Sequence, residues 1–99
     1  MSKVKTRPFD AADYIQSPQD AVFLLEAAFE EGDPSVIAEA IGAIARSKGM
    51  TDVAEKTGLS RESLYRALSA NGNPTLSTTL QVLKALGLRL SVTGNQTAA

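Results

Sequence analysis

The chain has 99 residues, of which 43% are hydrophobic and 21% are charged, so its length and composition fit a single globular domain. Cysteine and histidine are both absent, which excludes disulfides, thiol nucleophiles and zinc sites built from these residues, and argues against an enzyme. We therefore also expect no cofactor and no metal. No apolar segment is long enough for a membrane span or a signal sequence, so we expect a cytoplasmic protein.

The two halves of the chain carry opposite net charges. Residues 1–45 contain three Lys or Arg and eight Asp or Glu, a net charge of −5, whereas residues 46–99 contain seven and three, a net charge of +4. Such asymmetry indicates a basic surface for a polyanion beside an acidic surface for another partner. A chance distribution of charge is the alternative.

Helix start and stop signals divide the first half into three helices. A short helix is expected at 9–15, with Asp10 as its cap. Ser17 followed by Pro18 begins a second helix, which ends at Gly32. Asp33 and a further proline begin a third helix, and its apolar stripe comprises Val36, Ile37, Ala40, Ile41, Ile44 and Ala45.

The second half is divided into shorter elements. Thr51 is expected to cap a helix to Thr57, and Ser60 another helix to Ser69. A turn at 71–74 precedes the last helix, which Thr75 opens. Its apolar face is predicted to comprise Leu76, Leu80, Leu83 and Leu86.

The predicted fold class is all-α, a small helical bundle with one short C-terminal β-strand. Leu88–Val92 alternates apolar and polar residues as a strand does. We divide the chain into an N-terminal segment (1–16), a main domain (17–92) and a flexible tail (93–99).

Residues 50–69 have the pattern of a helix-turn-helix. Val53 and Ala54 face inward on the first short helix, and Gly58 supplies the positive φ that a tight turn requires. Leu59 covers the turn. The second helix buries Leu64, Ala67 and Leu68. An ordinary α-hairpin of a small bundle is the alternative.

Burial of these leucines turns the polar side of the second helix outward. Arg61 and Arg66 could then contact guanine in a major groove, although isolated surface arginines are commonly only solvated. Glu62 contributes only if it accepts from a cytosine amine or orients an arginine, and Tyr65 can instead pack its ring at the rim. The candidate DNA-binding residues here are Ser60, Arg61, Glu62, Tyr65, Arg66 and Ser69.

The chain resembles the addiction-module antidote proteins, which are antitoxins of the Xre/Cro-like helix-turn-helix class. The resemblance rests on the order and spacing of short motifs along nearly the whole chain. These motifs are Phe9-Asp10 with Tyr14, Leu24 to Ala28, Glu31 to Pro34, Ile44 to Arg46 with Gly49-Met50, Gly58 to Glu62 with Leu64-Tyr65, Asn73-Pro74 with Thr78, and Ala85 to Leu90.

The resemblance implies a lambda-repressor-like fold and a bacterial antitoxin that binds double-stranded operator DNA, usually as a dimer. It also implies repression of the protein's own operon and neutralisation of a RelE/ParE-type toxin. A phage-type repressor without a toxin is the alternative. Where relatives often carry a phosphate-binding Gln, this chain has Asp52, so operator affinity is weaker or the contact passes to Thr51.

Toxins of that class are usually basic, so the resemblance assigns the acidic half of the chain to the toxin-facing surface. A solubilising helix face is the alternative for each carboxylate. The candidate toxin-binding residues are Asp20, Glu26, Glu30, Glu31 and Glu39.

The predicted C-terminal strand has no clear partner in its own chain. Pairing with a second copy would satisfy its backbone groups and bury Leu88, Leu90 and Val92. A homodimer of this kind should place its two recognition helices about 34 Å apart. The alternative partner of the strand is the stretch Lys3–Arg7.

Overall fold

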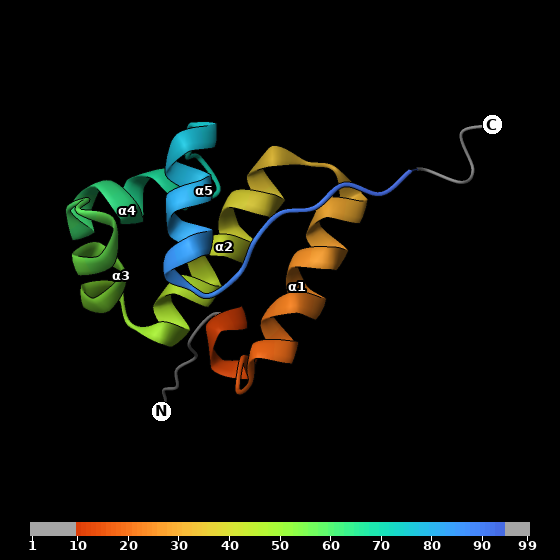
Figure 1. Ribbon diagram of the computed structural model, residues 1–99, viewed down its shortest axis with the longest axis horizontal. Coiled ribbons are helices and arrows are strands. Elements are labelled where there is room, and N and C mark those ends of the chain that lie inside the picture. The colour runs from red at the N-terminus through yellow and green to blue at the C-terminus, as the bar shows by residue number, and fades with distance from the viewer. Residues whose placement is uncertain (1–9, 95–99) are drawn as a thin grey trace, which may run out of the picture.

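The computed structural model describes residues 10–94, which form one 3₁₀ helix and five α-helices (Figure 1). The predictions for Lys3–Arg7 and for residues 95–99 lie outside the described residues. Among the described residues, no helix is both long and apolar enough to cross a membrane. The elements are η1 (Ala11–Tyr14), α1 (Pro18–Glu31), α2 (Pro34–Lys48), α3 (Met50–Thr57), α4 (Arg61–Ala67) and α5 (Leu76–Ala85).

Side-chain caps begin four of the α-helices, as predicted. In α1 the Ser17 hydroxyl accepts a hydrogen bond from the backbone N–H of Asp20 at 3.2 Å, and Pro18 occupies the first helical position. Equivalent caps satisfy the first backbone N–H groups of the other three helices. They are Asp33 for α2, Ser60 for α4 and Thr75 for α5.

The prediction that Thr51 caps a helix is wrong. α3 begins one residue earlier, at Met50, and its N-cap is Gly49, which makes no side-chain hydrogen bond. Gly49 has a φ of 116°, so the chain turns from α2 directly into α3 and leaves no space for a separate cap. Thr51 is an exposed residue of the first turn of α3, and α4 ends at Ala67 instead of Ser69.

α2 is the central helix and contacts η1, α1, α3 and α4. Ala38 and all residues 40–45 are buried, whereas the predicted stripe would leave one face of this helix exposed. The difference arises because each neighbour covers a different face. Gly42 permits one close approach, since a Cβ atom at this position would lie 2.2 Å from the backbone oxygen of Leu68 after α4.

α5 packs against α3, and the prediction of its buried face is confirmed for Leu83 and in part for Leu86 but is wrong for Leu76 and Leu80. Val82 and Leu83 are buried and Leu86 is half-buried, whereas Leu76 is 68% exposed and Leu80 is also exposed. The 100° step per residue places Leu80 well away from Val82, at the edge of the buried face, whereas Leu76 shares the side of Leu83 and is exposed as the first residue of α5. Val82 and Leu83 therefore mark the side of α5 that faces the core.

The prediction of a C-terminal strand is wrong for the described residues. Residues 88–94 leave α5 as an extended segment without a backbone ladder (Figure 1). Only Leu88 packs against the core, and Val92 is 96% exposed. A strand needs a neighbouring strand for its backbone groups, and the described part of this chain offers none.

Candidate nucleic-acid interface

A short turn of Gly58, Leu59 and Ser60 joins α3 to α4. Gly58 has a φ of 75° and its N–H donates to the carbonyl of Ala54 at 2.9 Å, which closes α3. The Thr57 hydroxyl donates to the Val53 carbonyl at 2.8 Å and accepts from the Leu59 N–H at 3.2 Å. These bonds fix the direction in which the chain enters α4.

Apolar side chains hold one side of this helix pair against the body. Val53 and Leu64 are completely buried and Leu68 is nearly so. Ala54, Leu59 and Ala67 are partly buried against the same core. The predicted inner side of residues 50–69 is thereby confirmed, and it sets which side of α4 faces solvent.

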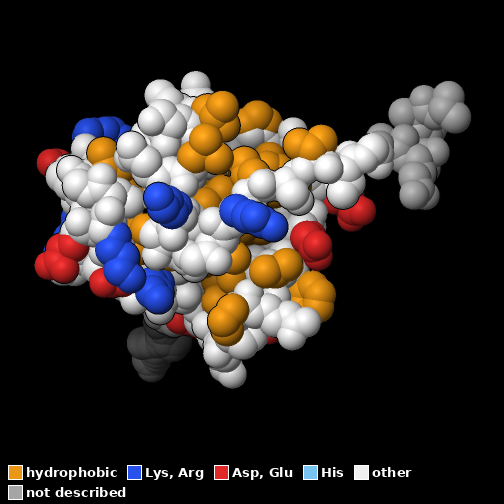
Figure 2. Space-filling view, viewed as in Figure 1, with side chains coloured by type: hydrophobic (Ala, Val, Ile, Leu, Met, Phe, Trp, Pro, Cys, Tyr) orange, Lys and Arg blue, Asp and Glu red, His pale blue; other side chains and the backbone are white. Residues whose placement is uncertain are grey.

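The outer side of α4 presents two arginines. Arg61 and Arg66 are exposed, as is Glu62, and neither arginine forms an ion pair with another described residue. All Lys and Arg within residues 10–94 lie at or after Arg46. Figure 2 shows such side chains in blue over the part formed by α3, α4, α5 and the segment that follows. Two guanidinium groups are thus available to an external anion.

The start of α4 uses the Ser60 side chain internally. Its hydroxyl accepts from the Ser63 N–H at 3.0 Å and donates to the Ser63 hydroxyl at 2.9 Å. A phosphate at this point would therefore meet the first backbone N–H groups of the helix together with a hydroxyl that is already engaged.

Asp52, in the first turn of α3, pairs with Lys56 one turn later. Its Oδ2 atom lies 3.4 Å from Nζ of Lys56, and both side chains are about half exposed. An exposed pair of this kind contributes less than about 1 kcal/mol, so Lys56 can exchange this partner for a phosphate at little cost. The sequence reasoning did not include Lys56, although the i,i+4 spacing from Asp52 is the signal that would have found it.

Tyr65 and Ser69 lie in a different setting from the arginines. Both line a pocket of about 520 Å³ between η1, α1, α2 and the end of α4. Tyr65 is exposed and Ser69 is half-buried, so Tyr65 sits at a rim, as the alternative interpretation of this residue expects. Among the predicted DNA-binding residues, the lining of this pocket includes only these two.

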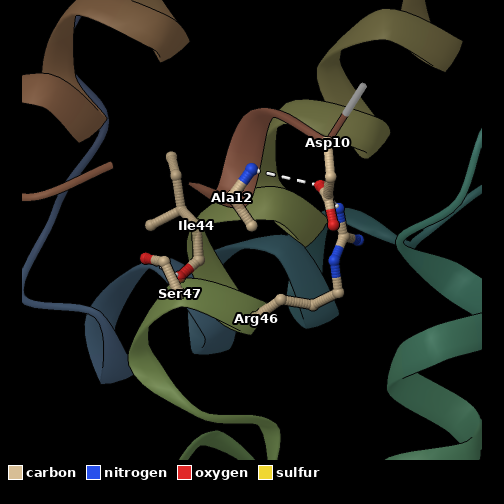
Figure 3. Close-up of polar contacts among 5 residues, drawn as sticks. All are labelled: Asp10, Ala12, Ile44, Arg46 and Ser47. Atoms are coloured by element: carbon tan, nitrogen blue, oxygen red, sulfur yellow. Dashed lines mark hydrogen bonds and ion pairs between the residues drawn. The ribbon is translucent and has the colours of Figure 1, made fainter. Parts of the chain in front are cut away.

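An ion pair lies in the wall of this pocket (Figure 3). Nη2 of Arg46, near the end of α2, lies 2.6 Å from Oδ1 of Asp10. The same carboxylate oxygen accepts from the backbone N–H of Ala12 at 3.1 Å and so caps η1. The pair ties η1 to α2, and its side chains are about one third exposed.

The candidate toxin-binding carboxylates do not form one cluster. Glu31 and Glu39 line the pocket described above, whereas Glu26 and Glu30 are exposed without lining it. The Asp20 carboxylate accepts from the backbone N–H of Gln16 at 2.9 Å and helps to fix the start of α1. Within α1, helix periodicity separates Glu31 from Glu26, five residues earlier, whereas Glu39 reaches the pocket from α2.

Comparisons with known proteins give one family. The family model described as "Probable addiction module antidote protein" matches residues 5–94. An uncharacterized protein of Haemophilus influenzae is 40% identical over 86 residues, which cover 87% of this chain and 89% of that protein. No solved structure matches the chain. The family implies a cognate toxin and a regulatory protein instead of an enzyme. The chain belongs to the family of probable addiction-module antidote proteins.

Proposed function

We propose that this protein is a cytoplasmic antitoxin that binds the operator of its own operon, represses it and neutralises a RelE/ParE-type toxin. α3 and α4 act as a lambda-repressor-like helix-turn-helix of the Xre/Cro class, with α4 in the major groove. One observation carries the proposal: α4 exposes Arg61 and Arg66 while Leu64 and Leu68 hold its other side in the core. A bound metal or cofactor has no role in it.

The proposed DNA contacts divide into base and phosphate contacts. Arg61 and Arg66 read guanines, and Glu62 orients a neighbouring arginine or accepts from a cytosine amine. Thr51 and Ser60 stand at the starts of α3 and α4, where helix N-termini favour phosphate oxygens. Lys56 joins them as a phosphate contact. Tyr65 and Ser69 contact the DNA at the edge of the major-groove interface.

Loss of either arginine should weaken operator binding. In a mobility-shift assay on the DNA upstream of the gene, Arg61→Ala or Arg66→Ala should cost about 1–3 kcal/mol at particular base positions if the arginine reads bases. A phosphate contact should instead weaken all sequences alike and reduce the salt slope by about one. Lys84→Ala is the matched control, since Lys84 is an exposed cation on α5.

The outcome that contradicts DNA binding is equally clear. The operator part of the proposal is wrong if the wild-type protein does not bind duplex DNA at low ionic strength. It is also wrong if the arginine variants bind DNA as well as Lys84→Ala does. Toxin binding is a separate measurement and would still stand.

The toxin-facing part rests on the charge of residues 10–45. This stretch contains eight carboxylates and no Lys or Arg. A basic toxin would be attracted to it over several ångströms, with faster association at low salt. Asp20, Glu26, Glu30, Glu31 and Glu39 are the proposed contributors. The family match favours this function over a phage-type repressor without a toxin.

We propose further that the operator-binding form is a homodimer that uses the C-terminal segment. Leu90 and Val92 are exposed apolar side chains on an extended backbone, and Leu88 anchors this backbone to the core. A second copy would cover them, and two copies read two successive grooves. Covering such side chains removes apolar area from water.

Charge at the C-terminal segment should therefore dissociate the dimer. The double variant Leu90→Lys, Val92→Lys is expected to have the mass of one chain by light scattering at a concentration where wild type is dimeric. Thr93→Lys is the control for added charge, and it should remain a dimer. An unchanged mass for the double variant would place the dimer contact elsewhere.

A further inference from the structure

The aromatic side chains of the described residues all lie on the surface. They are Tyr14, Phe23, Phe29 and Tyr65, and the buried core consists of Ala, Val, Ile, Leu and Met. Tyrosine has a hydroxyl that water can solvate, but phenylalanine has none. Exposed phenylalanines are therefore the unexplained residues of this set, and aromatic side chains are enriched where proteins bind one another.

Both phenylalanines belong to α1. Phe23 is 59% exposed, Phe29 is 42% exposed and Val22 on the same helix is 39% exposed. Their helix buries Ala21, Leu25 and Ala28 against the core, so these three larger side chains remain outside a face that is already complete. The fold of the described chain leaves a large part of each of these side chains in contact with water.

The helix period brings these side chains together with two carboxylates. Steps of 100° place Val22, Phe29, Glu26 and Glu30 within one sector of α1, with Phe23 at its edge. Figure 2 shows hydrophobic and acidic side chains next to each other where Figure 1 places α1. We call these five residues the outer face of α1.

The charge of this face selects its partner. Neither Glu26 nor Glu30 forms an ion pair with another described residue, and no cation occurs within residues 10–45. A second copy bound symmetrically would bring the two carboxylates of each chain into one interface without a cation from this face, and such like charges repel. A partner with Lys or Arg around an apolar groove would pair with the carboxylates and cover the phenylalanines.

We propose that the outer face of α1 is the docking surface for the toxin, with Phe23 and Phe29 as its apolar anchors. This inference rests on the proposed antitoxin function and names the surface that performs it. The toxin presents an apolar groove with a basic rim, and α1 lies in it as an amphipathic helix does in a protein groove. Glu26 and Glu30 pair with the rim.

The test measures binding of the purified product of the reading frame adjacent to this gene. Phe23→Ser and Phe29→Ser in the full chain should each weaken its binding about 30-fold or more, as loss of a central interface anchor does. Glu26→Gln with Glu30→Gln should lower the association rate and flatten its salt dependence. Leu76→Ser, which removes a leucine that is 68% exposed on α5, is the control for loss of an exposed apolar side chain elsewhere.

Two further readouts separate docking from folding and from self-association. Operator mobility shifts of the serine variants should match wild type, and the unfolding midpoint of Phe23→Ser should match it too, since Phe23 is 59% exposed. A photoreactive residue at position 23 should cross-link to the adjacent-frame product, whereas the same residue at position 76 should not. This second measurement keeps the test decisive even if a serine variant folds poorly.

The possible failures are distinguishable. If wild type does not bind the adjacent-frame product, the antitoxin function fails and this inference fails with it. If wild type binds the product but both serine variants bind equally well and position 23 forms no cross-link, only the docking surface is wrong. A cross-link from position 23 to a second copy of this chain would also overturn it.

Discussion

Leu64→Ala is expected to destabilise the protein by about 3 kcal/mol or more, within the range measured for fully buried leucines. Leu64 is completely buried and is the only buried residue within the seven residues of α4. Its truncation leaves a cavity where α4 meets the core. Urea or thermal unfolding measures the effect, and a loss of this size should lower the melting temperature by at least about 10 °C in a chain of this length.

Leu76→Ala provides the control for this prediction. The side chain of Leu76 is 68% exposed, so its truncation should change the free energy of unfolding by no more than about 0.5 kcal/mol. Equal stability of the two alanine variants would mean that α4 is not held to the body through Leu64.

Gly42→Ala should destabilise the protein by about 2 kcal/mol, although alanine normally favours an α-helix over glycine by about 1 kcal/mol. The added Cβ would lie 2.2 Å from the backbone oxygen of Leu68. Because this clash is with backbone, rotation of a side chain cannot relieve it. α2 and the end of α4 must therefore separate. Denaturant unfolding gives the sign directly, and operator affinity under folding conditions should also fall because α4 is displaced.

Gly94→Ala is the matched substitution in open space, since a Cβ there meets no atom within 4 Å. Its stability should equal that of wild type. A Gly42→Ala protein that is as stable as wild type, or more stable, would show that α4 does not approach α2 this closely.

Helix starts could be predicted because they depend on neighbouring residues alone. The caps Ser17, Asp33, Ser60 and Thr75 each bond to a backbone N–H two or three positions along the chain. Such a bond forms whatever the rest of the chain does, so composition and spacing reveal it. Thr51 has the right residue type, but the turn at Gly49 already places Met50 in the helix.

Features that depend on residues distant in the sequence could not be predicted from local sequence patterns. Burial of residues 40–45 of α2 depends on four neighbours, and the exposed position of Leu76 and Leu80 depends on where α3 meets α5. Alternation at 88–92 describes an extended backbone correctly, but a strand also needs a partner that periodicity does not supply.

The candidate site divides in the same way. Exposure of Arg61 and Arg66 follows from the helical period once Leu64 is buried, and the prediction of an outward basic side agrees with the structure. The pocket beside Tyr65 and Ser69 could not be predicted, because η1 and α2 supply its other walls. The proposed anchors on α1 were not predicted, because the signals at Ser17 and Gly32 mark only where this helix begins and ends.

The enclosure of α2 has a consequence for how the protein melts. Every other described helix except α5 contacts α2, α5 contacts α3, and the five α-helices share one core, so we expect these helices to unfold together. Unfolding should be a single transition. A ligand that binds any one face then raises the melting temperature of the whole, by an amount that grows with the logarithm of its concentration over its dissociation constant. Calorimetry of the protein with DNA as the added ligand would thus report on the unfolding of residues far from the nucleic acid.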